Sequence, residues 1–311
     1  MNSSTAPYIR RKKNNIWKLT MKNSVSLPVM FCSSLLTTLI QVEASAETIP
    51  IWEKGAPGAL GETVRDIPTL VIYKAPADIS TGTAIILCQG GSYSGHYEGQ
   101  GEPFARWLNQ HGASVFLLKY RLGSAGYRYP TQLSDLSRTV RLVRSRAEEW
   151  RIKPNRVGVM GFSAGGHLVS SLCVSFDAGD SASQDPVERQ SCRPDFAILC
   201  YPVISMLSKP HNESRRNLLG DKPSEDSLHK ASSELNVRAD TPPCFIWHTV
   251  EDTLVPPDHS LLFAAALLKA KVPCEIHLYE KGPHGTGLMG TKHPWMDDLL
   301  FWMRQRDGLL K

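Results

Sequence analysis

Beyond residue 46 the chain alternates between short apolar runs and longer segments with apolar residues three or four positions apart. Short apolar runs rich in β-branched and aromatic residues predict buried strands, and the longer pattern predicts helices with one apolar face. The predicted strands are Thr69–Tyr73, Ala84–Cys88, Ser114–Tyr120, Arg156–Met160, Phe196–Tyr201, Cys244–His248 and Glu275–Tyr279. The predicted helices are Glu102–His111, Leu133–Trp150, Ala164–Phe176, Asp258–Lys271 and Pro294–Arg306.

This alternation predicts an α/β protein with a mostly parallel central sheet and helices on both of its faces. Residues 204–237 break the pattern, because they are largely polar and too long for a plain connection. We expect them to form a small, partly helical cap or insertion over the carboxyl edge of the sheet. Residues 47–311 are thus predicted to form a single domain.

The first 46 residues have the pattern of an export signal. Six basic residues come first, an apolar run follows from Val25 to Val42, and Ala44-Ser45-Ala46 provides a small-x-small cleavage site. This order predicts a signal peptide, residues 1–46, that is cleaved after Ala46, and a secreted or periplasmic protein. Translation from either Met1 or Met21 fits the pattern.

Two other interpretations of this leader are weaker. A transmembrane anchor would need a longer run with fewer hydroxyl residues. A lipid-modified Cys32 is disfavoured because the bulky Phe31 precedes it. We therefore expect no stable membrane insertion after cleavage.

The charge distribution limits the partners. The formal net charge is +5, but the leader carries the excess, and the remaining residues include 29 basic and 29 acidic side chains. A balanced domain of this kind does not favour a nucleic-acid partner.

Six of the seven cysteines follow the leader. None forms a C-x-x-C pair, so the sequence implies no zinc site, and it implies no other metal or organic cofactor. Cys88 and Cys200 fall inside predicted strands, where buried free thiols are common. Cys173 and Cys192 are a possible loop-closing disulfide.

The strongest candidate for chemistry is Gly161-Phe162-Ser163-Ala164-Gly165, which joins a predicted strand to a predicted helix. A G-x-S-x-G turn in this position exposes the serine hydroxyl on a sharp elbow, and its small residues let the backbone close up. The helix that follows favours negative charge at its start. Ser163 is therefore the candidate nucleophile.

A serine nucleophile needs a base and an orienting acid. In the order Ser, acid, His, the candidates that follow predicted strands are Asp252 and His284. Glu251 and Asp258 are the alternative acids, and the alternative bases are His248 and His293.

Backbone donors for an oxyanion are expected in Gln89-Gly90-Gly91-Ser92-Tyr93, directly after the strand Ala84–Cys88. We predict the N–H groups of Gly91, Ser92 and Ala164, with the pair within residues 90–92 left open. A phosphate-binding loop is disfavoured because neither glycine-rich phosphate motif is present. Tyr93 is predicted to bind substrate by narrowing the acyl pocket.

Taken together, these motifs resemble the α/β-hydrolase serine esterases grouped with acetylxylan esterases and hormone-sensitive-lipase-like carboxylesterases. The resemblance covers about residues 65–306 and departs from the group at Gln89, where relatives usually have His or Pro before three glycines. It rests on Gln89-Gly-Gly-Ser-Tyr93, Glu102-Pro-Phe-Ala-Arg-Trp-Leu108, Tyr120-Arg-Leu122, Arg141-Leu-Val-Arg-Ser-Arg-Ala147, Gly161-Phe-Ser-Ala-Gly-Gly-His-Leu168, Asp252-Thr-Leu-Val-Pro256 and Gly282-Pro-His-Gly285.

The resemblance implies the α/β-hydrolase fold, with Ser163, Asp252 and His284 as the catalytic triad. It also implies hydrolysis of short-chain acyl esters, acetyl above all, on a small ester or an acylated polysaccharide such as acetylated xylan. A prolyl-oligopeptidase-like peptidase, a lipase and a catalytically inactive binding protein are the alternatives.

Overall fold

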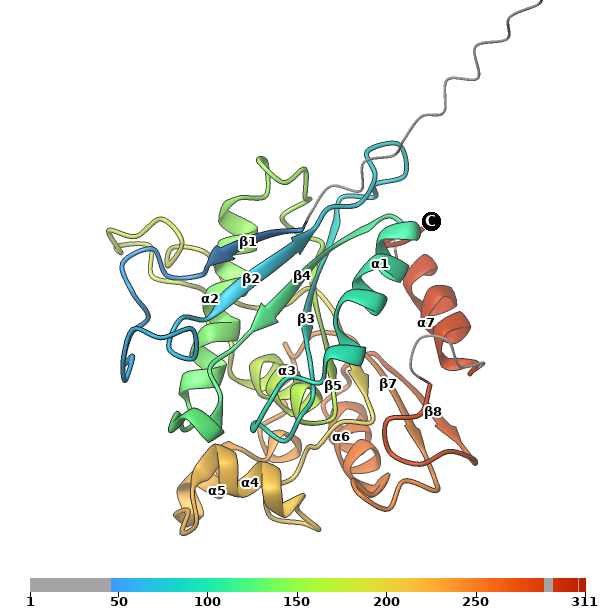
Figure 1. Ribbon diagram of the computed structural model, residues 1–311. Helices are drawn as coiled ribbons and strands as arrows, with labels where there is room; N and C mark the ends of the chain where they lie inside the picture. The colour runs from blue at the N-terminus through green and yellow to red at the C-terminus, as the bar shows by residue number, and fades with distance from the viewer. Residues whose placement is uncertain (1–45, 288–292, 307) are drawn as a thin grey trace, which may run out of the picture. The chain divides into compact units, whose positions relative to one another are not determined.

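Within residues 46–287, 293–306 and 308–311, which the computed structural model describes, eight strands form one sheet (Figure 1). Their order across the sheet is β1-β2-β4-β3-β5-β6-β7-β8. The strands are β1 (Glu47–Pro50), β2 (Thr69–Tyr73), β3 (Thr83–Cys88), β4 (Ala113–Lys119), β5 (Val157–Phe162), β6 (Ala197–Cys200), β7 (Cys244–Thr249) and β8 (Cys274–Tyr279). The predicted signal peptide lies outside the described residues, apart from Ala46.

The six strands from β4 to β8 in this order run parallel, whereas β2 pairs antiparallel with β4 and with β1. The predicted mostly parallel α/β sheet is confirmed. The strand β1 was not predicted, because it has four largely exposed residues and no apolar run. Each strand that was predicted is present, with ends shifted by up to two residues.

Helices cover both faces of the sheet. One apolar core lies between the sheet and α2, α3 and α6, and the other between the sheet and α1 and α7. These helices are α1 (Glu102–Gln110), α2 (Thr131–Ser145), α3 (Ala164–Ser175), α6 (Asp258–Lys269) and α7 (Trp295–Arg304).

Strand β3 illustrates why the central strands read as continuous apolar runs. Ile86 and Cys88 point to the core beneath α2 and α3, and Ile85 and Leu87 to the core beneath α1 and α7. All six residues of β3 are buried. A strand covered on both faces leaves no position for a polar side chain to reach water.

The polar segment at residues 204–237 contains two short helices, α4 (Asn212–Leu219) and α5 (Glu225–Lys230), and one 3₁₀ turn at Ser233–Leu235. The side chain of Ser224 caps α5 by accepting a hydrogen bond from the Ser227 N–H at 3.2 Å. The arrowheads in Figure 1 mark the carboxyl ends of the parallel strands, and α4 and α5 lie beyond these ends. The segment therefore borders the edge where the candidate residues are found.

The six cysteines in the described region are free thiols, so the suggested bridge between Cys173 and Cys192 is not present. Cys192 instead accepts a hydrogen bond from the backbone N–H of Asp177. Among the described helices, none combines the length and apolar character that crossing a bilayer requires.

Candidate active site

Ser163 occupies the sharp turn between β5 and α3, with φ of +52°. The turn requires glycine on both sides. A Cβ at Gly161 would lie 2.2 Å from the Gly165 carbonyl oxygen, and one at Gly165 would lie 2.3 Å from that of Cys88. The close approach of Gly165 to Cys88 also sets the loop after β3 directly against the turn. The strained backbone places Ser163 at the N-cap of α3, on the turn and not within the helix.

His284 reaches Ser163 from the loop after β8. Its Nε2 lies 2.9 Å from the Ser163 Oγ, and its Nδ1 lies 2.6 Å from Oδ2 of Asp252. The carboxylate can only accept at Nδ1, so Nδ1 carries the hydrogen and Nε2 is free to take the serine proton. Gly282 and Gly285, both with positive φ, shape the tight loop that aims the ring.

Asp252 follows β7 and is almost completely buried. Its Oδ1 accepts the backbone N–H groups of Leu254 and Val255, and its Oδ2 also lies 3.1 Å from Nε2 of His248. Burial by itself raises the pKa of this carboxyl, but the hydrogen bonds from His248 and His284 outweigh it and hold the pKa below its ordinary value. The group is therefore ionised, as an acid that orients an imidazole must be.

The alternative acids and bases lie elsewhere. Glu251 binds the Lys281 ammonium at 2.8 Å and the Gly282 N–H at 3.0 Å, and Asp258 pairs with Lys209. His248 is fully buried behind Asp252, and its Nδ1 bonds with Ser260. The ring of His293 packs on Trp247. The structure thus brings together Ser163, His284 and Asp252. His248 contacts only the Asp252 end of this chain of hydrogen bonds, and Glu251, Asp258 and His293 lie outside it.

The loop after β3 faces the nucleophile. A Cβ at Gly90 would lie 3.0 Å from the Cβ of Ser163, so the backbone passes close to the hydroxyl. The Gly90 N–H is already taken by Oε1 of Gln100 at 2.7 Å. Within the described residues, the N–H groups of Gly91, Ser92 and Ala164 have no acceptor. These three donors are available to an oxyanion.

The conformation of this loop is unusual, because Gly91, Ser92 and Tyr93 in succession have positive φ. Two polar side chains from other elements help to hold it. Asn217 in α4 donates to the Ser92 carbonyl at 2.8 Å, and the Tyr120 hydroxyl donates to the Gln89 carbonyl at 2.7 Å.

Tyr93 does not lie where the sequence suggested. Its side chain is completely buried, and its hydroxyl lies 2.7 Å from Nδ1 of His167 in α3. We therefore correct the prediction that Tyr93 contacts substrate, since a positive φ turns the side chain into the protein. It is Tyr201 that lies beside the base, with its ring edge-on to His284 at 5.0 Å between centroids.

A protein-family model, BD-FAE, matches residues 70–267, which is more than half of the chain. The chain belongs to the BD-FAE family. The match includes Ser163 and Asp252, and His284 follows the matched residues. The sheet and its flanking helices are those of the α/β-hydrolase fold.

Known relatives of this BD-FAE chain include an acetylxylan esterase and an endo-1,4-beta-xylanase. The chain is 36% identical over 226 residues to an acetylxylan esterase from Xylanibacter ruminicola, covering 71% of this chain and 44% of that protein. It is 37% identical over 222 residues to endo-1,4-beta-xylanase B from Butyrivibrio fibrisolvens, covering 70% of this chain and 34% of that protein. The chain thus spans between a third and a half of these relatives.

One solved structure matches a larger share of both chains than these two relatives do. The acetyl ester-xyloside bifunctional hydrolase from Caldicellulosiruptor lactoaceticus is 40% identical, with a TM-score of 0.79. The match covers 85% of this chain and 97% of that one.

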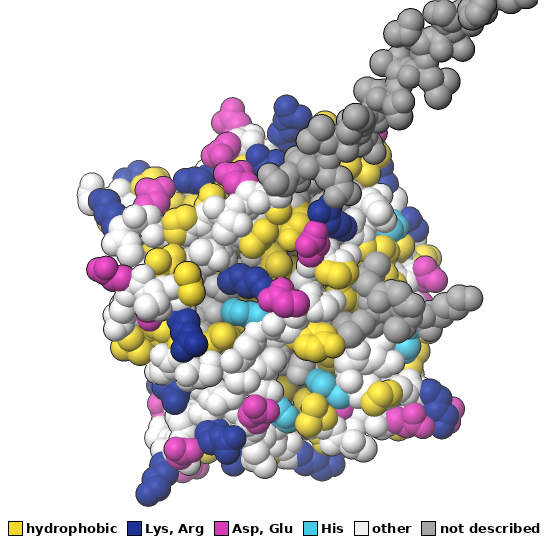
Figure 2. Space-filling model, in the orientation of Figure 1, with side chains coloured by type: hydrophobic (Ala, Val, Ile, Leu, Met, Phe, Trp, Pro, Cys, Tyr) yellow, Lys and Arg dark blue, Asp and Glu magenta, His cyan; other side chains and the backbone are white. Residues whose placement is uncertain are grey.

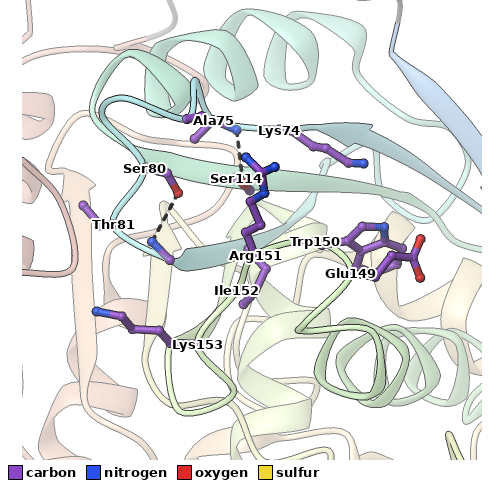
Figure 3. A pocket seen from close by; sticks show the side chains of 12 residues that line it. Lys74, Ala75, Ser80, Thr81, Ser114, Glu149, Trp150, Arg151, Ile152 and Lys153 are labelled. Atoms are coloured by element: carbon purple, nitrogen blue, oxygen red, sulfur yellow. Dashed lines mark hydrogen bonds between the residues drawn. The ribbon is translucent and has the colours of Figure 1, made fainter.

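Among the described residues, no group of three or more His, Cys, Asp or Glu side chains is arranged to hold a metal ion. A cavity of about 570 Å³, whose lining includes Lys74, Arg151 and Lys153, is drawn in Figure 3. Its lining residues lie before β3, before β5 or, in the case of Ser114, at the start of β4, whereas Ser163, Asp252 and His284 follow the carboxyl ends of parallel strands. That cavity is therefore separate from the candidate active site.

Proposed function

We propose that this chain is a serine esterase that removes short acyl groups, acetyl above all, from carbohydrate such as acetylated xylan. The observation that carries the proposal is the continuous line of hydrogen bonds from Ser163 through His284 to Asp252. The relatives named above support the choice of an acetylated sugar as substrate.

The first half-reaction acylates the enzyme. The Ser163 Oγ attacks the ester carbonyl carbon while His284 Nε2 takes its proton, and the carbonyl electron pair moves to the oxygen. The N–H groups of Ala164 and of Gly91 or Ser92 stabilise that oxyanion. When the intermediate collapses, the C–O bond to the sugar breaks, and the sugar oxygen receives the proton from His284.

The second half-reaction returns the enzyme. A water molecule gives a proton to His284 Nε2 and attacks the acyl carbon, and collapse of the second intermediate releases the acid and restores the Ser163 hydroxyl. Asp252 remains ionised throughout and stabilises the imidazolium that forms twice in each cycle.

The proposed enzyme works outside the cytoplasm. This part of the proposal rests on the basic, apolar and small-residue order of residues 1–46. Intact-mass measurement of the exported protein tests it, with an N-terminus at Glu47 expected and a full-length cytoplasmic protein as the contrary result.

Acetate release from acetylated xylan, measured beside p-nitrophenyl acetate, p-nitrophenyl octanoate and a peptide amide, tests the activity. We expect hydrolysis of the two acetyl esters. Faster hydrolysis of the octanoyl ester would favour a lipase, and cleavage of the amide would favour a peptidase.

A further inference from the structure

A second cavity lies at the same edge of the sheet as Ser163. Its volume is about 440 Å³, and its walls include Ile67, Ser94, His96 and Leu122. The walls come from the carboxyl end of β4, the amino end of β2 and the loop after β3. In the sheet β3 lies between β4 and β5, so two strand spacings, roughly 10 Å, separate the β4 side of this cavity from β5, the strand that Ser163 follows.

One loop connects the cavity to the nucleophile. Residues 89–97 fold back on themselves, because the Ser94 N–H donates to the Gly91 carbonyl at 2.8 Å and the Tyr97 N–H donates to that of Gly90 at 3.0 Å. Gly90 packs against Ser163, whereas Ser94 and His96 line the cavity. The loop that offers the oxyanion donors on one side thus forms a wall of the cavity on the other.

His96 lines this cavity and has a buried ring nitrogen without a partner. Its ring packs edge-on against Tyr120 at 4.6 Å, and its Nε2 is buried with no hydrogen bond to any described residue. Burial, assisted by the charge of Lys119, lowers the pKa of His96 to about 4, so the ring is neutral at neutral pH. A hydroxyl can donate or accept, and it therefore pairs with a neutral imidazole nitrogen in either tautomer.

The rest of the lining mixes apolar side chains with polar and basic ones, among them Arg65. Val64 and Ile67 present exposed apolar surface. Lys119 is paired with Glu98, and Arg121 with Asp135. A cavity of this volume lies in the size range of small-molecule sites, and its polar side chains together with Val64, Ile67 and Leu122 suit a ligand that has both hydroxyl groups and apolar faces.

We propose that this cavity binds an unesterified sugar residue of the same saccharide chain whose acyl group lies at Ser163. This inference rests on the proposed function and adds a subsite to it. A sugar ring has hydroxyl groups for His96 and Ser94 and apolar C–H faces for Ile67 and Val64. The separation of two strand spacings requires a chain of more than one sugar residue to occupy both places.

The test compares a long and a short substrate. His96→Phe keeps a ring against Tyr120 and removes the nitrogen, and Ile67→Ala removes apolar surface from another part of the lining. For each variant, kcat/KM is measured on an acetylated xylo-oligosaccharide and on p-nitrophenyl acetate, which is too small to reach the cavity. We expect the ratio of the two values to fall about fivefold in His96→Phe, the factor that one neutral hydrogen bond provides. Leu262→Ala, on the exposed side of α6, serves as the control.

A binding measurement separates this inference from the proposed function. Calorimetric titration of Ser163→Ala with xylohexaose, which carries no ester, should show binding that weakens when His96→Phe is added. Two results would overturn the subsite and leave the esterase proposal intact. One is an unchanged kcat/KM ratio in both variants, and the other is xylohexaose binding of equal affinity with and without His96→Phe. If the wild type hydrolyses no acetyl ester, the proposed function itself is overturned.

Discussion

The Tyr93 hydroxyl lies 2.7 Å from Nδ1 of His167 and so joins the loop after β3 to the helix that follows Ser163. Nε2 of His167 lies 2.7 Å from the carbonyl of Ala231, which can only accept, so Nε2 carries the hydrogen and Nδ1 accepts from Tyr93. One histidine thus connects three segments around the candidate site. Both side chains are almost completely buried.

The first prediction concerns this contact. Tyr93→Phe leaves Nδ1 of His167 buried without a donor, which should cost about 1–3 kcal/mol of unfolding free energy. Because the loop also carries the oxyanion donors, kcat should fall more than KM changes. Denaturant unfolding and steady-state kinetics measure the two effects, with Tyr97→Phe as an exposed control. A stable variant with wild-type kcat would show that the contact does not position the loop.

The second prediction separates two adjacent carboxylates. Asp252→Asn should reduce kcat by up to ~10⁴-fold, because the amide no longer holds the His284 tautomer that accepts the serine proton. Glu251→Gln should have a much smaller effect, since Glu251 contacts Lys281 and the Gly282 N–H outside the chain of hydrogen bonds. Equal losses, or a larger loss for Glu251→Gln, would show that Asp252 is not the orienting acid.

The third prediction concerns acid stability. Burial lowers the pKa of His167 from 6.5 to about 4. The unfolded chain therefore binds a proton below pH 6.5 that the folded protein does not bind until about pH 4. The free energy of unfolding is therefore highest above pH 6.5, where His167 is neutral in both states, and it decreases as the pH falls from 6.5 to about 4.

Chemical denaturation from pH 7 to pH 4 measures this effect. The buried His259, whose pKa is also lowered to about 4, adds to it. His167→Gln should reduce the slope of unfolding free energy against pH by up to about 1.4 kcal/mol per pH unit. An identical slope in wild type and variant would mean that His167 takes up its proton alike in both states.

The fourth prediction concerns acyl length. Tyr201 is almost completely buried beside His284 and is bonded through its hydroxyl to Gln100, so it fills the space next to the base and leaves no open channel there for a long chain. We expect acetyl or propionyl esters to have the highest kcat/KM in a p-nitrophenyl series, with a fall of about tenfold or more by octanoyl. In an open apolar channel each methylene would add about 0.8 kcal/mol, and the values would rise with length instead.

The patterns that predicted the fold are local and strong. The residues of β3 have no polar side chain beyond Thr83, and the elbow around Ser163 needs its glycines because a Cβ would meet backbone. The order of Ser163, Asp252 and His284 along the chain, each after a strand, was enough to expect them at one edge of the sheet.

What the sequence did not predict depends on contacts between distant residues. Gln100 and Asn217 hold the loop after β3, and no local pattern marks either of them. The inward orientation of Tyr93 depends on positive φ at a residue that is not glycine, for which the sequence carries no signal. His167 was visible in the elbow motif, but its partner Ala231 lies 64 positions away.

The most direct test of the account is the kcat/KM of Ser163→Ala on p-nitrophenyl acetate. Removing the nucleophile leaves only the oxyanion donors and substrate binding, so the value should fall on the order of 10⁴-fold or more while the variant remains folded. Ser175→Ala, at the far end of α3, should keep wild-type activity. A Ser163→Ala variant that retains a tenth or so of wild-type activity would contradict the assignment of Ser163 as the nucleophile.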